Sequence, residues 1–238
     1  MSSFANLMVA IVGAGNVGSN LGRNLLKAGA QVVYGARDPT SPKTLASIEQ
    51  LPGAKAMSIP DAVSWSNVVI LAIPGMRTQE AYDALASSLG SGIEGKVVLD
   101  ATNPLGAFPA LEVLYENTSG GEMCAKALPS SFVFKAFNTI GAEHMGTPDG
   151  SLIPGSVGPL TMLFAGDASK KDIAASVVSA VGFAPRYVGP IRYARNLESV
   201  AELWIHLAVP PAGFTQESWG RNFHFQVADS ASGSKPEL

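Results

Sequence analysis

The sequence LMVAIVGAGNVG at residues 7–18 joins a short apolar run to a cluster of glycines. An unbroken apolar run that ends in glycine is typical of a strand buried on both faces of a sheet. The residues that follow, Val17–Ala28, have the spacing of an amphipathic helix that ends at Gly29. The stretch therefore predicts a strand, a tight glycine turn and a helix in direct succession.

The glycines of this turn fit the pattern G-x-G-x-x-G. In this context the first glycine permits the tight turn, the second lets the backbone approach a pyrophosphate, and the third lets the helix pack on the strand. The helix N-terminus offers N–H groups and partial positive charge to phosphates. The alternative is a glycine turn without a ligand, and the lack of Gly-Lys-Ser/Thr excludes a P-loop. We expect a dinucleotide in contact with Gly13, Ala14, Gly15, Asn16, Val17 and Gly18.

Further apolar runs alternate with helix-like segments along the chain. The predicted strands are Gln31–Tyr34, Asn67–Ile73, Lys96–Ala101, Phe132–Phe137, Thr161–Ala165 and a short one around Arg186–Val188. The predicted helices are Ser41–Gln50, Arg77–Leu89, Ser169–Val181 and Ile191–Val209. Between Leu105 and Ser131 we expect irregular chain, with a loop at residues 118–121. The alternation predicts a doubly wound α/β fold with a mostly parallel Rossmann sheet and a small C-terminal helical appendage.

The residues after the second predicted strand indicate which dinucleotide binds. An NAD site usually carries an acidic residue there, about 20 residues after the glycines, to bind the ribose 2′-OH. Because the strand is predicted to end at Tyr34-Gly35, Ala36 takes that position and Arg37 follows. Ala36 removes the repulsion that a carboxylate would exert on a 2′-phosphate, and Arg37 can pair with that phosphate. Lys43 adds a further donor and Asp38 belongs to a turn, so we predict NADP rather than NAD.

Other strand ends offer a second part of the site. Ligands of an open α/β sheet bind beyond the carboxyl ends of its strands. Those ends carry Ile73, Pro74, Asn103, Asn138 and Thr139, which suit a nicotinamide ring and its carboxamide. The alternative is that the asparagine side chains bond local backbone. No nucleophile–base pair stands there, so we predict no catalytic side chain, and the histidine spacing fits no metal motif.

Composition limits the remaining function classes. The chain has 238 residues, of which 47% are hydrophobic and 15% charged, and this excludes a disordered protein. A net charge of −3 gives no electrostatic footprint for nucleic acid, and no basic amphipathic stretch indicates a membrane surface. The N-terminus lacks the positive charge of a signal peptide, so we expect a cytoplasmic protein. The single cysteine, Cys124, excludes an internal disulfide and is expected to be buried.

The segment KAFNTIGAEHM at residues 135–145 is the most diagnostic of several matches to a known family. Further matches lie at residues 13–18, 34–38, 71–74, 99–104, 163–167 and 220–223. From about residue 7 to 226 the chain resembles the NADP oxidoreductases that depend on coenzyme F420. The cytosolic oxidoreductase domain of the STEAP metalloreductases shares this pattern.

The resemblance implies direct hydride transfer between NADP(H) and a second cofactor, which could be F420, FMN or FAD. It places NADP(H) on the first glycine turn, and the flavin-like ring over the loop after Phe137. The positions carried over from the family are the glycine turn, Arg37, and the Asn103 and Asn138 segments. Such chemistry needs proximity and orientation more than a protein acid or base.

Length limits where a second substrate can bind. The predicted elements use about 190 residues, which leaves too little chain for a separate substrate domain. We therefore divide the chain into an NADP-binding Rossmann domain at residues 1–190, a C-terminal helix and cover segment at 191–229, and a disordered tail at 230–238. The second substrate must lie in a shallow cleft or in one that a dimer partner completes, and we expect a homodimer. Phe214, Trp219, Phe223 and Phe225 could cover that cleft or be plain core.

Two other functions fit the same residues. An NADPH-dependent imine or carbonyl reductase needs a proton donor, for which His144 is the candidate. The other possibility is a non-catalytic NADP(H)-sensing protein, which would bind NADPH tightly without a hydride acceptor.

Overall fold

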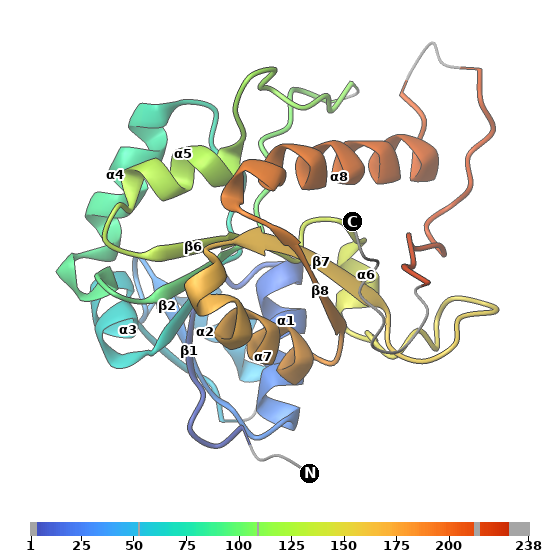
Figure 1. The fold of residues 1–238 in the computed structure, drawn as a ribbon. Coiled ribbons are helices and arrows are strands. Elements are labelled where there is room, and N and C mark those ends of the chain that lie inside the picture. Colours follow the sequence, from blue (N-terminus) through green and yellow to red (C-terminus); the bar gives the residue numbers. More distant parts are fainter. Residues whose placement is uncertain (1–3, 52, 109, 212–214, 229–238) are drawn as a thin grey trace.

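The computed structural model describes residues 4–51, 53–108, 110–211 and 215–228. One eight-stranded sheet runs through the molecule in the order β3-β2-β1-β4-β5-β6-β7-β8 (Figure 1). All neighbouring strands are parallel except β6 and β7, which are antiparallel. The doubly wound, mostly parallel sheet predicted from the sequence is therefore confirmed.

The elements follow one another in strand–helix alternation. The strands are β1 Met8–Val12, β2 Gln31–Ala36, β3 Lys55–Ser58, β4 Val68–Leu71, β5 Val97–Asp100, β6 Phe132–Lys135, β7 Thr161–Gly166 and β8 Ala184–Gly189. The helices are α1 Asn16–Lys27, α2 Pro42–Glu49, α3 Ile59–Trp65, α4 Gln79–Leu89, α5 Gly120–Ala127, α6 Ala142–Met145, α7 Lys171–Val181 and α8 Ala194–Ala208.

The sheet is covered on both faces, which explains the unbroken apolar runs. Successive residues of β1 point to opposite faces. Val9 and Ile11 belong to one hydrophobic core with residues of α1 and α7, such as Leu21. Ala10 and Val12 belong to a second core with residues of α3, α4 and α5. Figure 1 shows α1 and α7 together in its lower half, with α4 and α5 in its upper half.

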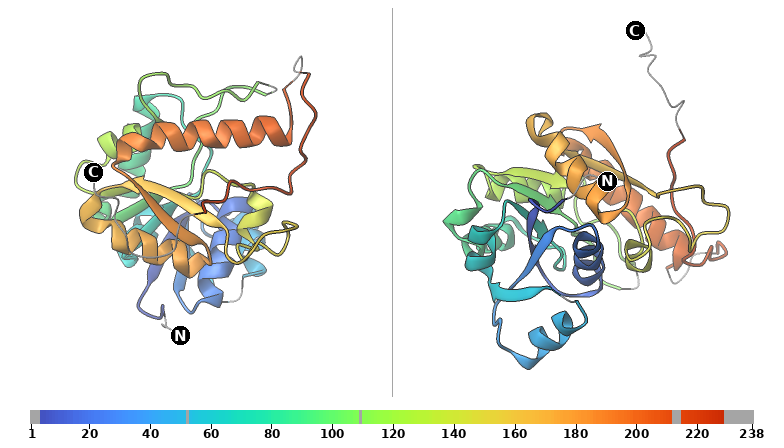
Figure 2. Two further views of the ribbon diagram at one scale, coloured as in Figure 1. Left: turned by 45° about the vertical axis from the view of Figure 1, so that its right-hand side comes forward. Right: turned by 90° about the horizontal axis from the view of Figure 1, so that it is seen from below.

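The chain after β8 adds α8 and an aromatic segment. Helix α8 runs next to α5 and β7, and buries Leu197, Ala201 and Trp204 (Figure 2). The following segment returns to α8, where the indole N–H of Trp204 donates to the carbonyl of Phe223 at 3.1 Å. The rings of Trp204 and Phe223 are stacked, with centroids 5.3 Å apart. Of the residues predicted as a cover, Phe214 lies outside the described part of the chain, as does the tail at 230–238.

The structure corrects the predicted loop at residues 118–121. Gly120 and Gly121 form the first turn of α5, and the Ser119 hydroxyl caps it by accepting from the Glu122 N–H at 3.1 Å. A Cβ at Gly120 would lie 2.4 Å from the Tyr82 hydroxyl oxygen. These glycines therefore serve close packing rather than a turn.

The same helix contains Cys124, which is 1% exposed as predicted. Burial raises the pKa of its thiol well above the ordinary value. Cys124 is therefore a buried apolar side chain.

The sequence patterns above do not predict β3 and α3. β3 is a short edge strand without a fully buried residue, so it lacks the apolar run that reveals the inner strands. Helix α3 nevertheless has a local signal. The Ser58 hydroxyl accepts from the Asp61 N–H at 3.3 Å, and a proline occupies the first turn. Within the described part of the chain, no helix is long and apolar enough to cross a membrane.

Candidate cofactor-binding site

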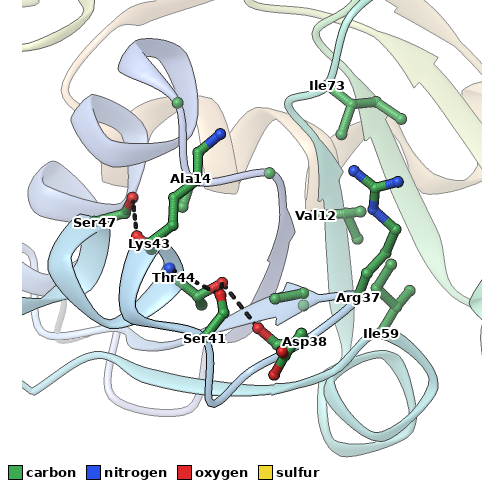
Figure 3. A pocket seen from close by; sticks show the side chains of 14 residues that line it. Val12, Ala14, Arg37, Asp38, Ser41, Lys43, Thr44, Ser47, Ile59 and Ile73 are labelled. Carbon is green, nitrogen blue, oxygen red and sulfur yellow. Dashed lines mark hydrogen bonds between the residues drawn. The ribbon is translucent and has the colours of Figure 1, made fainter.

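A cleft of about 760 Å³ opens at the carboxyl ends of β1 and β2 (Figure 3). Its volume falls in the range of cofactor sites. It is lined by Val12, Gly13, Ala14, Gly15, Gly35, Ala36, Arg37, Asp38, Ser41, Lys43, Thr44, Ser47, Ile59 and Ile73. The predicted site residues among them are Gly13, Ala14, Gly15, Ala36, Arg37, Lys43 and Ile73. The structure thus brings together the glycine turn, the end of β2 and the start of α2.

The three glycines of the turn are needed for different reasons. Gly13 has a φ of +108°, and a Cβ there would lie 2.4 Å from the Ala72 carbonyl oxygen. A Cβ at Gly18 would lie 2.0 Å from the Gly13 carbonyl oxygen. At Gly15, in contrast, a Cβ would meet no heavy atom within 4 Å. The fold itself needs Gly13 and Gly18, whereas the space beside Gly15 is open to a ligand.

Helix α1 begins at this cleft without a side-chain cap. Helices α2, α3, α4 and α5 each begin at a Ser or Thr whose hydroxyl accepts from an N–H of the first turn. Helix α1 begins instead after Gly15, and its first turn holds no acidic residue. No side chain therefore competes with an anion for these N–H groups, which belong to Asn16, Val17 and Gly18.

Two cations reach across the cleft from different elements. β2 continues through Ala36, so Arg37 is the first residue after the strand. Figure 3 shows the Arg37 side chain extending toward Ile73, and the Lys43 side chain extending toward Ala14 on the opposite side. Lys43 stands on α2, a helix that buries none of its residues. The cleft thus offers two positive charges, and Ala36 leaves the end of β2 without a carboxylate.

Asp38 also lines the cleft but belongs to a turn, as predicted. Its Oδ1 accepts from the Thr40 N–H at 3.0 Å and from the Thr40 hydroxyl at 2.8 Å. The hydrogen bonds from the side chain and backbone of Thr40 lower the pKa of Asp38. The carboxylate is therefore ionised and engaged with its own turn.

The predicted residues at the ends of β5 and β6 lie outside the lining of this cleft. The Asn103 amide donates to the Asn138 carbonyl at 3.0 Å, and the Asn138 amide donates to Asn103 Oδ1 and to the Leu197 carbonyl, each at 3.1 Å. Both asparagine side chains thus bond neighbouring protein groups, which agrees with the alternative that they serve the local structure of the loops. Asn138 Oδ1, however, is buried without a hydrogen-bond partner among the described residues. This oxygen is therefore the acceptor of the pair that no described residue satisfies.

The other predicted residues lie close by. Thr139 is buried after Asn138, and Pro74 is exposed after Ile73. The loops after β4 and β5 touch, because a Cβ at Gly75 would lie 2.1 Å from the Asn103 carbonyl oxygen.

Sequence reasoning missed Thr44, Ser47 and Ile59 as lining residues. Ile59 belongs to α3, which was not predicted, although the capping signal at Ser58 reveals the start of that helix. Thr44 and Ser47 share α2 with Lys43, and the Ser47 hydroxyl donates to the Lys43 carbonyl at 2.9 Å. Ser47 follows Lys43 by four residues, so helical spacing is the signal that could have found it, whereas Thr44, directly after Lys43, has no such signal.

The histidines bond backbone carbonyls. His144 Nε2 lies 2.7 Å from the Arg221 carbonyl oxygen, and the residue is fully buried. The Nε2 atoms of His206 and His224 each lie 2.6 Å from a carbonyl oxygen, of Ala110 and Thr161 respectively. Within the described ranges, no group of three or more His, Cys, Asp or Glu side chains could hold a metal ion.

A known protein with a similar sequence is a reductase by name. The chain is 30% identical over 195 residues to the metalloreductase STEAP3 of Rattus norvegicus. This alignment covers 81% of the chain but only 36% of the rat protein.

Solved structures share the fold. A candidate F420-dependent NADP-reductase from Arthrobacter sp. superposes with a TM-score of 0.78 at 24% identity, covering 94% of this chain and 100% of that one. An imine reductase from Myxococcus stipitatus, solved with NADP+, has a TM-score of 0.56 at 20% identity. That match covers 83% of this chain and 61% of the imine reductase.

A family model matches residues 8–104, which run from β1 to the loop after β5 and include the glycine turn, Arg37 and Asn103. Its description is "NADP oxidoreductase coenzyme F420-dependent". The match agrees with the resemblance drawn from the sequence motifs. Over residues 8–104 the chain is therefore similar to the coenzyme F420-dependent NADP oxidoreductase family.

Proposed function

We propose that the protein is an NADP(H)-dependent oxidoreductase that transfers a hydride between NADPH and a flavin or a deazaflavin of the F420 type. The observation that carries the proposal is the end of β2, where Ala36 and the exposed Arg37 stand beside the open glycine turn. This arrangement suits a 2′-phosphate and lacks the acidic residue of an NAD site. The family description and the similar proteins support the same class of reaction.

The residues of the cleft and of the strand ends beside it fit the parts of NADP. The open space beside Gly15 and the uncapped start of α1 would hold the pyrophosphate. Arg37 and Lys43 would pair with the 2′-phosphate. Ile73, Pro74, Asn103, Asn138 and Thr139 would hold the nicotinamide half, where Asn138 Oδ1 lacks a partner. Bound NADPH supplies the hydride.

The ionisable groups of the site favour hydride transfer between cofactors over an acid–base mechanism. In the cleft lining they are Arg37, Asp38 and Lys43, and Asp38 is engaged with Thr40. Reduction of an imine or carbonyl would need a proton donor. His144 is fully buried and lies outside the cleft lining, with Nε2 on the Arg221 carbonyl, so it is not placed to protonate a substrate in the cleft. The protein's part is then to bind and orient.

The arrangement of the chain around this site is also part of the proposal. We assign NADP binding to residues 1–190 and the cover of the second substrate to residues 191–229, acting in a homodimer. The aromatic contacts of Trp204 with Phe223, and of Phe223 with Trp219, support a cover role.

Anaerobic NADPH oxidation, followed by absorbance with F420, FMN and FAD offered separately, tests the reaction. Rapid oxidation with one acceptor is the expected result and identifies the partner. NADPH binding without oxidation by any of the three would contradict the proposed reaction, and would favour a non-flavin substrate or a sensor.

Replacing Arg37 with alanine is expected to weaken NADPH binding far more than NADH binding. Loss of a charge-assisted bond to the 2′-phosphate costs about 1.5–3 kcal/mol, which is roughly 10- to 100-fold in Kd. Titration calorimetry with both nucleotides measures the effect. Lys27→Ala, at the far end of α1, is the control, and equal losses for NADPH and NADH would remove Arg37 from the phosphate role.

Alanine substitutions at two glycines of the turn are expected to separate binding from folding. Gly18→Ala places a Cβ against the Gly13 carbonyl oxygen and should lower the free energy of unfolding by about 1–3 kcal/mol. Gly15→Ala meets no protein atom, so it should leave stability unchanged and weaken NADPH binding. Urea unfolding and NADPH titration of both variants measure this. Unchanged NADPH affinity in Gly15→Ala would show that no ligand approaches Gly15.

A further inference from the structure

A buried ionic cluster joins the ends of β5 and β6 to α8. Lys135 Nζ lies 2.7 Å from Asp100 Oδ2 and 2.9 Å from Glu198 Oε1, and none of the three side chains is more than 1% exposed. Lys135 Nζ also donates to the Thr102 carbonyl at 2.8 Å. An ammonium has three N–H donors. All three are therefore used, by β5, by the loop after it and by α8.

Glu198 extends this cluster to α5. The N–H groups of Gly120 and Gly121 donate to its carboxylate, each at 3.0 Å. Two carboxylates and one ammonium leave one excess negative charge, which the partial positive charge at the start of α5 offsets. Burial alone would lower the pKa of Lys135, but Asp100 and Glu198 raise it above its ordinary value. The cluster is thus a closed set of charged groups with satisfied bonds.

Such a cluster is a costly way to stabilise a fold. The desolvation of buried ions often exceeds their attraction, and well-packed apolar residues would stabilise a fold as well or better. What directional bonds add is a single fixed arrangement of the parts that they join. Here those parts are α8 and the strand ends of β5 and β6.

The same turn of α8 also holds the amide pair at these strand ends. The Leu197 carbonyl, one residue before Glu198, accepts from the Asn138 side chain, which in turn bonds Asn103. Phe137, directly before Asn138, is fully buried with a φ of +62°, which few residues other than glycine adopt. A backbone held in this region needs support from its surroundings. Helix α8 supplies contacts on both sides of Phe137, to Lys135 before it and to Asn138 after it.

From this geometry we infer that Lys135 and Glu198 are positioning residues for the nicotinamide half of the cofactor. By fixing α8 on the ends of β5 and β6, they set the Asn103–Asn138 pair in its place. They act through these residues, because they are buried and lie outside the cleft lining. The inference rests on the proposed function. It assigns orientation of the nicotinamide to this cluster, and affinity to the separate cleft at Arg37.

Glu198→Gln tests the inference, because it removes one carboxylate and weakens the link from α8 to Lys135 and α5. The Kd for NADPH is expected to change little. The single-turnover rate of hydride transfer at saturating NADPH should fall on the order of 10- to 100-fold, since small misplacements of reacting groups have effects of this size. The fluorescence of bound NADPH should also move toward that of the free nucleotide, because the nicotinamide is less firmly held. This second readout does not depend on turnover.

Glu122→Gln is the matched control. Glu122 also links α5 to α8, through Arg195 at 2.7 Å, but it is partly exposed and does not touch Lys135. This variant should keep the wild-type rate and fluorescence. If Glu198→Gln yields no folded protein, Glu198→Asp carries the test, because it keeps the charge and shortens the reach.

Three outcomes would overturn the inference. Wild-type rate and fluorescence in a folded Glu198 variant would show that the cluster does not position the nicotinamide. An equal loss of rate and change of fluorescence in Glu122→Gln would mean that the cluster acts only through the general packing of α5 and α8. Failure of the wild-type protein to bind NADPH would overturn the proposed function together with the inference.

Discussion

Replacing Lys135 with methionine is expected to lower the free energy of unfolding by about 3–5 kcal/mol, the usual cost of removing one partner from a buried ion pair. Methionine has a similar length but no charge, so Asp100 and Glu198 would remain buried without their cation. Their N–H donors from Thr102, Gly120 and Gly121 would stay in place, yet these are too few to compensate two adjacent carboxylates.

Urea unfolding followed by circular dichroism measures this loss. Lys126→Met is the matched control, because Lys126 is exposed in the last turn of α5, where a cation adds only about 0.3–1 kcal/mol. A loss below about 1 kcal/mol in Lys135→Met would contradict the account of the cluster as a buried, mutually dependent set of charges.

Replacing Ala36 with aspartate is expected to reverse the choice of nucleotide. The new carboxylate would stand at the end of β2, beside the place assigned to the 2′-phosphate. Two like charges side by side cost several kcal/mol, so the Kd for NADPH should rise on the order of 100-fold or more. NADH has a free 2′-OH that the carboxylate can accept from, so its Kd should stay constant or fall.

Binding titrations with NADPH and NADH measure the preference. Ala36→Asn has nearly the same size without the charge, and should weaken NADPH binding much less than Ala36→Asp. If the two variants lose equal affinity for NADPH, the effect is steric and Ala36 does not read the 2′ position.

The parts of the fold that depend on local pattern were predictable. β1, the glycine turn and α1 are adjacent in sequence, so one apolar run and one set of glycines specify them. Similar apolar runs predict where β2 and β4 end. Those ends bring Ala36, Arg37 and Ile73 to the cleft.

The parts that depend on distant contacts were not predictable. Lys135 ends an otherwise apolar strand and Glu198 stands on an amphipathic helix, and nothing near either residue indicates its partner. The Gly120-Gly121 pair has the composition of a loop, and becomes a helix start because Glu198 binds its N–H groups. Neither the cluster nor the bond from Asn138 to α8 follows from periodicity. Both need the three-dimensional arrangement.

Helix α2 buries none of its residues, although it carries Lys43, Thr44 and Ser47 to the cleft. Ile48 of this helix packs against one core as a partly buried side chain, but substitutions at the residues that line the cleft should have little effect on either core. Selection for a different nucleotide can act on α2 without a matching loss of foldability. The protein thus separates a rim that tolerates substitution, to which we assign the nucleotide, from a glycine turn in which neighbouring backbone already fills the side-chain space at Gly13 and Gly18.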